Sequence, residues 1–278
     1  METAVERWQE LIRARAAQMD AAYARLGRTS ADFWDRRARG FHRSTRESAA
    51  SDPLYLRLRE QVTPQNSVLD VGAGTGRFSL ALSPFVRQVT ALEPNASMLQ
   101  YLREEIEAGG ITNINVLRST WEEAPDDLRA DIVICSHVLY PILDIVPFLK
   151  KLHAASEQAC FISMRAISFD ALTAPLWRHF HGEERQPPPG YIHALDVLYE
   201  LGIYAQVEIT KMLFAFTYPS LQDAEDELLD QLILEESEQT RRELRGLLKD
   251  WLIEDEDGAW RSPQFLTVLA ILSWRRDS

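Results

Sequence analysis

Cysteine and long apolar runs are scarce in this 278-residue chain. The only two cysteines, Cys135 and Cys160, both lie inside apolar segments, so we expect buried free thiols rather than a disulfide framework, and no metal site. No run of about 18 apolar residues occurs, and the N-terminal segment has no apolar signal region. These absences exclude a transmembrane helix and predict a cytoplasmic protein.

Basic charge is also in short supply. The chain has 30 basic against 42 acidic residues, which gives a formal net charge of −12. Proteins that bind nucleic acids normally carry a basic patch, because neutralising phosphates supplies most of their affinity. The arginines between Arg25 and Arg46 are spread among acids and apolar residues, and we interpret them as a solvated helix face. Nucleic-acid partners are therefore not expected.

Apolar strands alternate with helical patterns through the middle of the chain. The predicted strands cover residues 68–71, 88–94, 114–120, 131–138 and 159–165. The fourth is almost wholly apolar, as expected for a strand buried on both faces of a parallel sheet. Strands alternating with helices at this spacing predict an α/β fold with a mostly parallel sheet.

The flanking regions predict additions to this sheet. Amphipathic helices are predicted over residues 4–26, after Ser30 and from Asp52–Pro53, and residues 168–190 form a long excursion with three consecutive prolines. A strand over 203–218 and a last strand over 264–276 can pair antiparallel at one edge, with acidic helices between them. We therefore predict a helical cap or lid at 1–63 and a main domain at 64–278, with a helical insertion at about 218–260.

The strongest motif is VLDVGAGTGRFSLALS, residues 68–83. A strand delivers Asp70, and the glycines that follow let the backbone turn sharply with a ligand close against it. The next helix then points its free N–H groups at that ligand. Glu93 ends the second strand, where a carboxylate can bind two ribose hydroxyls.

A nicotinamide-binding domain uses similar physics but a different spacing. Its G-x-G-x-x-G pattern, started at Gly72, needs glycine at position 77, where this chain has Arg77. The G-x-G-x-G loop after an acid suits a ligand with an amino-acid tail and no phosphate. An oxidoreductase is therefore disfavoured.

These segments, with ALEPNASML and DIVICSHVLY, resemble the successive signatures of class I S-adenosylmethionine-dependent methyltransferases. They are most similar to the broad group that contains quinone-biosynthesis and small-molecule enzymes. The resemblance implies a Rossmann-like, seven-stranded, mostly parallel sheet flanked by helices, and S-adenosylmethionine as the cofactor. The implied cofactor-binding residues are Asp70, Gly72, Ala73, Gly74, Thr75, Gly76, Glu93, Pro94, Met98, Thr120, Trp121, Ser136 and His137. Trp121 either lies against the adenine ring or is an ordinary core residue, and the sequence leaves both interpretations open.

Methyl transfer from a sulfonium needs positioning and exclusion of water more than it needs a base. His137, directly after the fourth strand, is the leading candidate for a base or a cofactor-contacting group, and Tyr140 and Asp144 are weaker candidates. Trp177 and His179, on the proline-rich excursion, either line an acceptor pocket or lie on a surface loop without chemistry. Three further residues are predicted to belong to a lid, namely Trp34, Arg37 and Phe41.

The acceptor stays open. The acidic charge, the lid and the insertion favour a small molecule methylated on oxygen, nitrogen or carbon. The alternatives are a tRNA or protein acceptor, or a non-catalytic protein that binds S-adenosylmethionine. The oligomeric state is open between monomer and homodimer.

Overall fold

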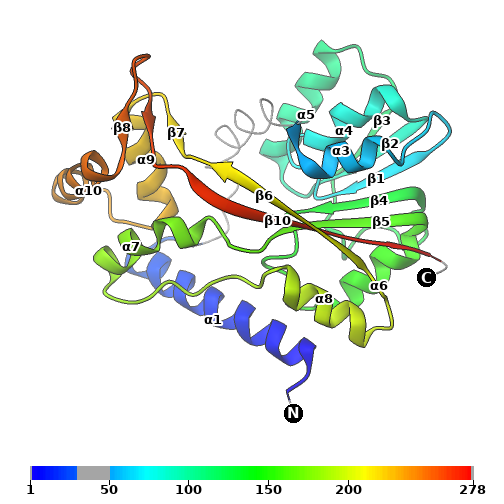
Figure 1. The fold of residues 1–278 in the computed structure, drawn as a ribbon, viewed down its shortest axis with the longest axis horizontal. Helices are drawn as coiled ribbons and strands as arrows, with labels where there is room; N and C mark the ends of the chain where they lie inside the picture. The colour runs from blue at the N-terminus through cyan, green and yellow to red at the C-terminus, as the bar shows by residue number, and fades with distance from the viewer. Residues whose placement is uncertain (1, 30–50, 277–278) are drawn as a thin grey trace.

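Seven strands form one sheet in the order β3-β2-β1-β4-β5-β10-β6, in a computed structural model that describes residues 2–29 and 51–276 (Figure 1). The strands are β1 Ser67–Val71, β2 Gln88–Leu92, β3 Ile114–Leu117, β4 Ala130–Ser136, β5 Ser156–Arg165, β6 Gln206–Phe214 and β10 Phe265–Arg275. Neighbouring strands run parallel, except that β10 is antiparallel to both β5 and β6. The mostly parallel sheet and the antiparallel edge pair are confirmed.

Helices cover both faces of this sheet (Figure 1). One face carries α3 Pro53–Arg59, α4 Arg77–Leu82 with the short 3₁₀ turn η3 Ser83–Phe85, and α5 Ala96–Ala108. The other face carries α1 Ala4–Arg25, α6 Ile145–Ala155 and α8 Tyr191–Glu200. In β4, Ile134 packs toward the first set and Val133 toward the second. Burial on both faces explains why this strand is almost wholly apolar.

A second hydrophobic cluster lies beside one end of the sheet. It is built from α7 Asp170–His181, α9 Leu221–Gln231, α10 Glu238–Trp251 and a small sheet of β7 Thr217–Tyr218, β8 Ile253–Glu254 and β9 Trp260–Arg261. Trp177, Leu228 and Leu248 are fully buried at its centre. Except for α7, these elements lie between β6 and β10 in the sequence. The division into domains stays a prediction.

The helix α7 was not predicted from the sequence. Residues 168–190 were interpreted as an excursion because of their prolines and charges, but Asp170–His181 is helical with Pro175 inside it. Proline removes one backbone hydrogen bond from a helix. Burial of Thr173 and Trp177 against the second cluster offsets that loss, and Gly182, at a φ of 73°, ends the helix.

Helix α1 contacts both clusters. Its first half places Trp8 in the core of the main sheet, where the indole Nε1 donates to the Ile142 carbonyl at 2.7 Å. Its last turns place Tyr23 in the second cluster. The helix predicted after Ser30 lies outside the described residues. None of the helices in the described ranges has the length and apolarity to span a membrane.

Candidate functional site

The glycine loop between β1 and α4 is held in a conformation that favours glycine. Gly72, Gly74 and Gly76 have φ angles of 75°, 57° and 91°, in the left-handed region. The amides of Gly72 and Ala73 donate to the Leu92 carbonyl at 2.8 and 3.0 Å, which ties the loop to the end of β2. A Cβ at Gly72 would come within 2.3 Å of the Val138 side chain. The Val138 side chain therefore packs directly against the loop backbone at Gly72.

Two buried carboxylates lie beside this loop. Ser79 donates its hydroxyl to Asp70 Oδ2 at 2.7 Å, and burial, reinforced by the nearby charge of Glu93, raises the pKa of Asp70 to about 6. Glu93 accepts the Gly74 amide on Oε2 at 2.9 Å and the Asn95 amide on Oε1 at 2.8 Å. Burial raises its pKa as well. Both groups favour a ligand that brings positive charge or hydroxyl donors.

The residues predicted near an adenine ring differ in their surroundings. Pro94 is exposed after β2, whereas Met98 is buried in the first turn of α5, which Asn95 caps. Thr120 accepts the Glu123 amide at 3.2 Å. Trp121 is buried in the main core, with its Nε1 donating to the Phe148 carbonyl at 3.2 Å. Of its two interpretations, the geometry favours the core residue.

Ser136 ends β4 at the carboxyl edge of the sheet, and the turn that follows holds His137, Val138 and Tyr140. The His137 amide donates to the Ser163 carbonyl at 2.9 Å, and its φ is 59°, which is uncommon for a residue other than glycine. Its Nδ1 lies 3.0 Å from the Tyr140 hydroxyl. Burial and the nearby arginines Arg165 and Arg77 lower the pKa of His137 to about 3. The ring is therefore neutral at physiological pH.

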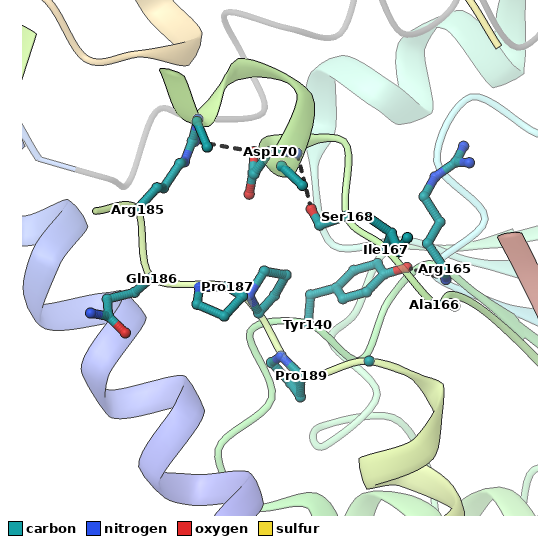
Figure 2. Close-up of a pocket in the computed structure, with 14 residues that line it drawn as sticks. Tyr140, Arg165, Ala166, Ile167, Ser168, Asp170, Arg185, Gln186, Pro187 and Pro189 are labelled. Carbon is teal, nitrogen blue, oxygen red and sulfur yellow. Dashed lines mark hydrogen bonds and ion pairs between the residues drawn. The ribbon is translucent and has the colours of Figure 1, made fainter. Parts of the chain in front are cut away.

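A cavity of about 320 Å³ is lined in part by the Tyr140 side chain. The β5–α7 connection and the first turns of α7 form one wall, and residues 185–190 form the other. Figure 2 shows the rings of Tyr140, Pro187 and Pro189 around one end, with Asp170 and Arg185 at the other. Because Val138 packs on Gly72 while Tyr140 lines the cavity, one turn touches both the glycine loop and the cavity.

The remaining predicted residues lie elsewhere. Trp177 is fully buried in the second cluster, stacked on His181, and His179 pairs with Glu243 at 2.7 Å. Neither lines the cavity. Asp144 is exposed before α6. The predicted lid residues Trp34, Arg37 and Phe41 lie outside the described residues. Over 2–29 and 51–276, no three side chains are grouped as metal ligands.

Sequence reasoning missed the charged and polar side chains that line the cavity, namely Arg165, Ser168, Asp170, Arg185 and Gln186, and it also missed Arg15, which pairs with Asp170. Arg165 is the last residue of an apolar strand at the carboxyl edge, a position close to the one that selected His137. Arg15 lies 155 residues from Asp170, so no local pattern connects them.

Comparisons with known proteins agree with this geometry. Residues 68–158 match a family described as a methyltransferase domain. Two relatives are each 26% identical: an uncharacterized Haemophilus influenzae protein over 63% of this chain, and the uncharacterized methyltransferase YcgJ of Bacillus subtilis over 42%. The chain spans 64% and 47% of the length of these relatives.

Two solved structures share the fold. The YcgJ structure has a TM-score of 0.54 at 14% identity, covering 82% of this chain and 97% of that one. A Bacillus halodurans protein has a TM-score of 0.55 at 18% identity, covering 81% and 99%. The chain therefore has the Rossmann-like fold of these two structures, and its residues 68–158 are similar to a methyltransferase domain.

Proposed function

We propose that the protein transfers the methyl group of S-adenosylmethionine to a small molecule. The observation that carries the proposal is the turn after β4, which contacts the glycine loop through Val138 and lines a cavity through Tyr140. A cavity of about 320 Å³ matches a metabolite-sized acceptor rather than a folded macromolecule. The predicted cytoplasmic location would suit such an acceptor.

The residues around the glycine loop fit the cofactor. S-adenosylmethionine, when bound, supplies a methyl group on a positively charged sulfur. Asp70 would pair with the ammonium of the methionyl part, which relieves the cost of a carboxylate buried among apolar groups. Glu93 would accept the ribose hydroxyls, because its two oxygens retain free lone pairs after accepting two amides. Gly72, Gly74 and Gly76 allow a ligand to lie against the bare backbone.

His137 would act as a fixed donor rather than as a base. The Tyr140 hydroxyl accepts the Arg165 amide at 2.9 Å and, in our proposal, donates to His137 Nδ1. The imidazole hydrogen then resides on Nε2. With a pKa of about 3, this ring is a poor proton acceptor. Its role would be to position the cofactor or the acceptor, and Tyr140 would hold the tautomer that does so.

The proposal is tested by following a labelled methyl group. Purified protein is incubated with methyl-labelled S-adenosylmethionine and a cell extract divided into small molecules, RNA and protein. We expect label in the small-molecule fraction, and none of it with a Gly74→Arg variant. Label transferred mainly to RNA or protein would contradict the small-molecule acceptor while leaving methyl transfer intact.

A further inference from the structure

The cavity beside Tyr140 has one apolar end and one charged end. Apolar surface comes from Ile167 and from the rings of Pro187 and Pro189, which lie around Tyr140 in Figure 2. These groups offer flat surfaces without hydrogen-bond donors. A small ring or a short hydrocarbon chain can fill this end without leaving a polar group unsatisfied.

The charged end is built around Asp170. Arg185 forms an ion pair with Asp170 Oδ1 at 3.1 Å, and Arg15 donates to Oδ2 at 2.5 Å. The Arg185 side chain is 5% exposed and those of Arg15 and Asp170 are each 17% exposed, so solvent screens these charges weakly. Arg15 also donates to the Gln186 carbonyl at 2.8 Å, and Arg185 lies 3.3 Å from Thr173 Oγ1. The guanidinium groups are thus fixed in place.

Positive charge exceeds negative charge around this space. Arg165 lines the cavity together with Arg185; its guanidinium lies 3.5 Å over the Phe169 ring, and with a pKa of about 10 it is charged at neutral pH. Among the described residues, Asp170 is the one carboxylate that lines the cavity with these two arginines. Glu184, nearby in sequence, is 70% exposed and pairs with Arg178. The whole chain has a net charge of −12, so a local excess of arginine does not simply reflect its overall composition.

We infer that this cavity binds a small, largely apolar molecule that carries one negatively charged group such as a carboxylate. The inference rests on the proposed function in one respect: it names this molecule's class as that of the methyl acceptor. The apolar part would lie against Tyr140 and the prolines, and the anion would face the guanidinium group of Arg185, while Arg15 offsets the charge of Asp170 from its other oxygen. Arginine suits this role because its fork matches carboxylate geometry.

Three probes of one shape and different charge test the inference. Phenylacetate, phenylacetamide and phenethylamine are titrated into the intact protein and followed by calorimetry and by ligand-observed NMR. We expect phenylacetate to bind at least about tenfold more tightly than the amide, and the amine to bind most weakly. Equal affinities, preference for the amine, or no binding of phenylacetate would overturn the inference.

Substitutions then separate recognition from a structural role. Arg185→Gln should remove the preference for phenylacetate over phenylacetamide. Asp170→Asn should raise phenylacetate affinity severalfold without changing that of the amide, because it leaves Arg15 and Arg185 unneutralised. A purely structural cluster would instead weaken all three probes together in Asp170→Asn, and that result would overturn the inference. Arg178→Gln, which breaks an exposed ion pair on the same helix, is the matched control.

Binding of S-adenosylhomocysteine is measured on every variant. If phenylacetate is not bound but S-adenosylhomocysteine is, the inference fails and the proposed function stands. If phenylacetate is bound with the expected charge preference but S-adenosylhomocysteine is not, the proposed function fails and the cavity remains an anion site. Retained S-adenosylhomocysteine binding also shows that a variant is folded.

Discussion

At the scale of single residues, Asp70 links stability to cofactor binding. Its pKa is raised from 3.8 to about 6 by burial, so the folded protein pays for ionising it as the pH rises through this range. The folded state therefore loses stability from this group between about pH 4 and pH 6, and the loss persists above. By linkage it amounts to about 2 to 3 kcal/mol.

Asp70→Asn should thus raise the free energy of unfolding at pH 7 and leave it nearly unchanged at pH 4. The amide oxygen still accepts the Ser79 hydroxyl. The same variant should bind S-adenosylhomocysteine more weakly, and it should lose the rise in affinity that we expect for the native protein between pH 5 and pH 7. Denaturant titrations and calorimetry at several pH values check both. A variant less stable at pH 7 would contradict this account of Asp70.

Tyr140 and His137 give a second prediction. Nitrogen NMR of the native protein should show the Nε2–H tautomer of His137 and no titration between about pH 5 and pH 8, because its pKa of about 3 lies below that range. In Tyr140→Phe, His137 should no longer be restricted to the Nε2–H tautomer. The same variant should lower the free energy of unfolding by about 1–3 kcal/mol, because the partly buried Arg165 amide loses its acceptor. A His137 pKa near 6.5 in the native protein would count against the donor role.

Sequence alone located the cofactor side of the site better than the acceptor side. Asp70, the glycines and Glu93 belong to short motifs at strand ends, and local spacing carries their meaning. Asp170, Arg15 and Arg185 come from three segments that meet only after folding. Trp177 and His179 lie on a helix whose direction the sequence did not reveal: that helix buries Trp177 in the second cluster and leaves His179 exposed beside Glu243.

At the scale of elements, Trp8 anchors helix α1 in the core of the main sheet. Trp8 is fully buried and its Nε1 donates to Ile142 beyond the β4 turn. Trp8→Ala should lower the free energy of unfolding by about 3–5 kcal/mol through the cavity it leaves. Trp8→Phe, which keeps most of the volume and loses the hydrogen bond, should cost less. Thermal unfolding ranks the two variants, and equal costs would contradict the packing argument.

Most elements were predictable because their periodicity and their ends agree. The strands are apolar runs bounded by turn residues, and Asn95 and Asp52 cap helices that begin where the sequence predicts them. Helix α7 was not predicted because the prolines and charges of residues 168–190 are typical of a loop. What stabilises it is tertiary burial of one face, which no local pattern records.

At the scale of the whole molecule, α1 joins the two hydrophobic clusters. Trp8 and Ile12 belong to the cluster of the main sheet, and Tyr23 belongs to that of α7, α9 and α10. We expect the native protein to unfold in one cooperative transition. Removing residues 1–27 should uncouple the clusters and give two transitions in calorimetry, the first from the α9–α10 region. A single transition in the truncated protein would show that other contacts couple them.

The central claim is that the glycine loop binds S-adenosylmethionine, and calorimetric titration tests it most directly. S-adenosylmethionine, S-adenosylhomocysteine and NADH are titrated into the native protein and into Gly74→Arg. Gly110→Arg is the control, because Gly110 has a similar φ of 61° but nothing within 4 Å of its Cβ position. We predict micromolar binding of the two sulfur ligands, none of NADH, and loss only in Gly74→Arg. A folded native protein that binds neither sulfur ligand would contradict the account.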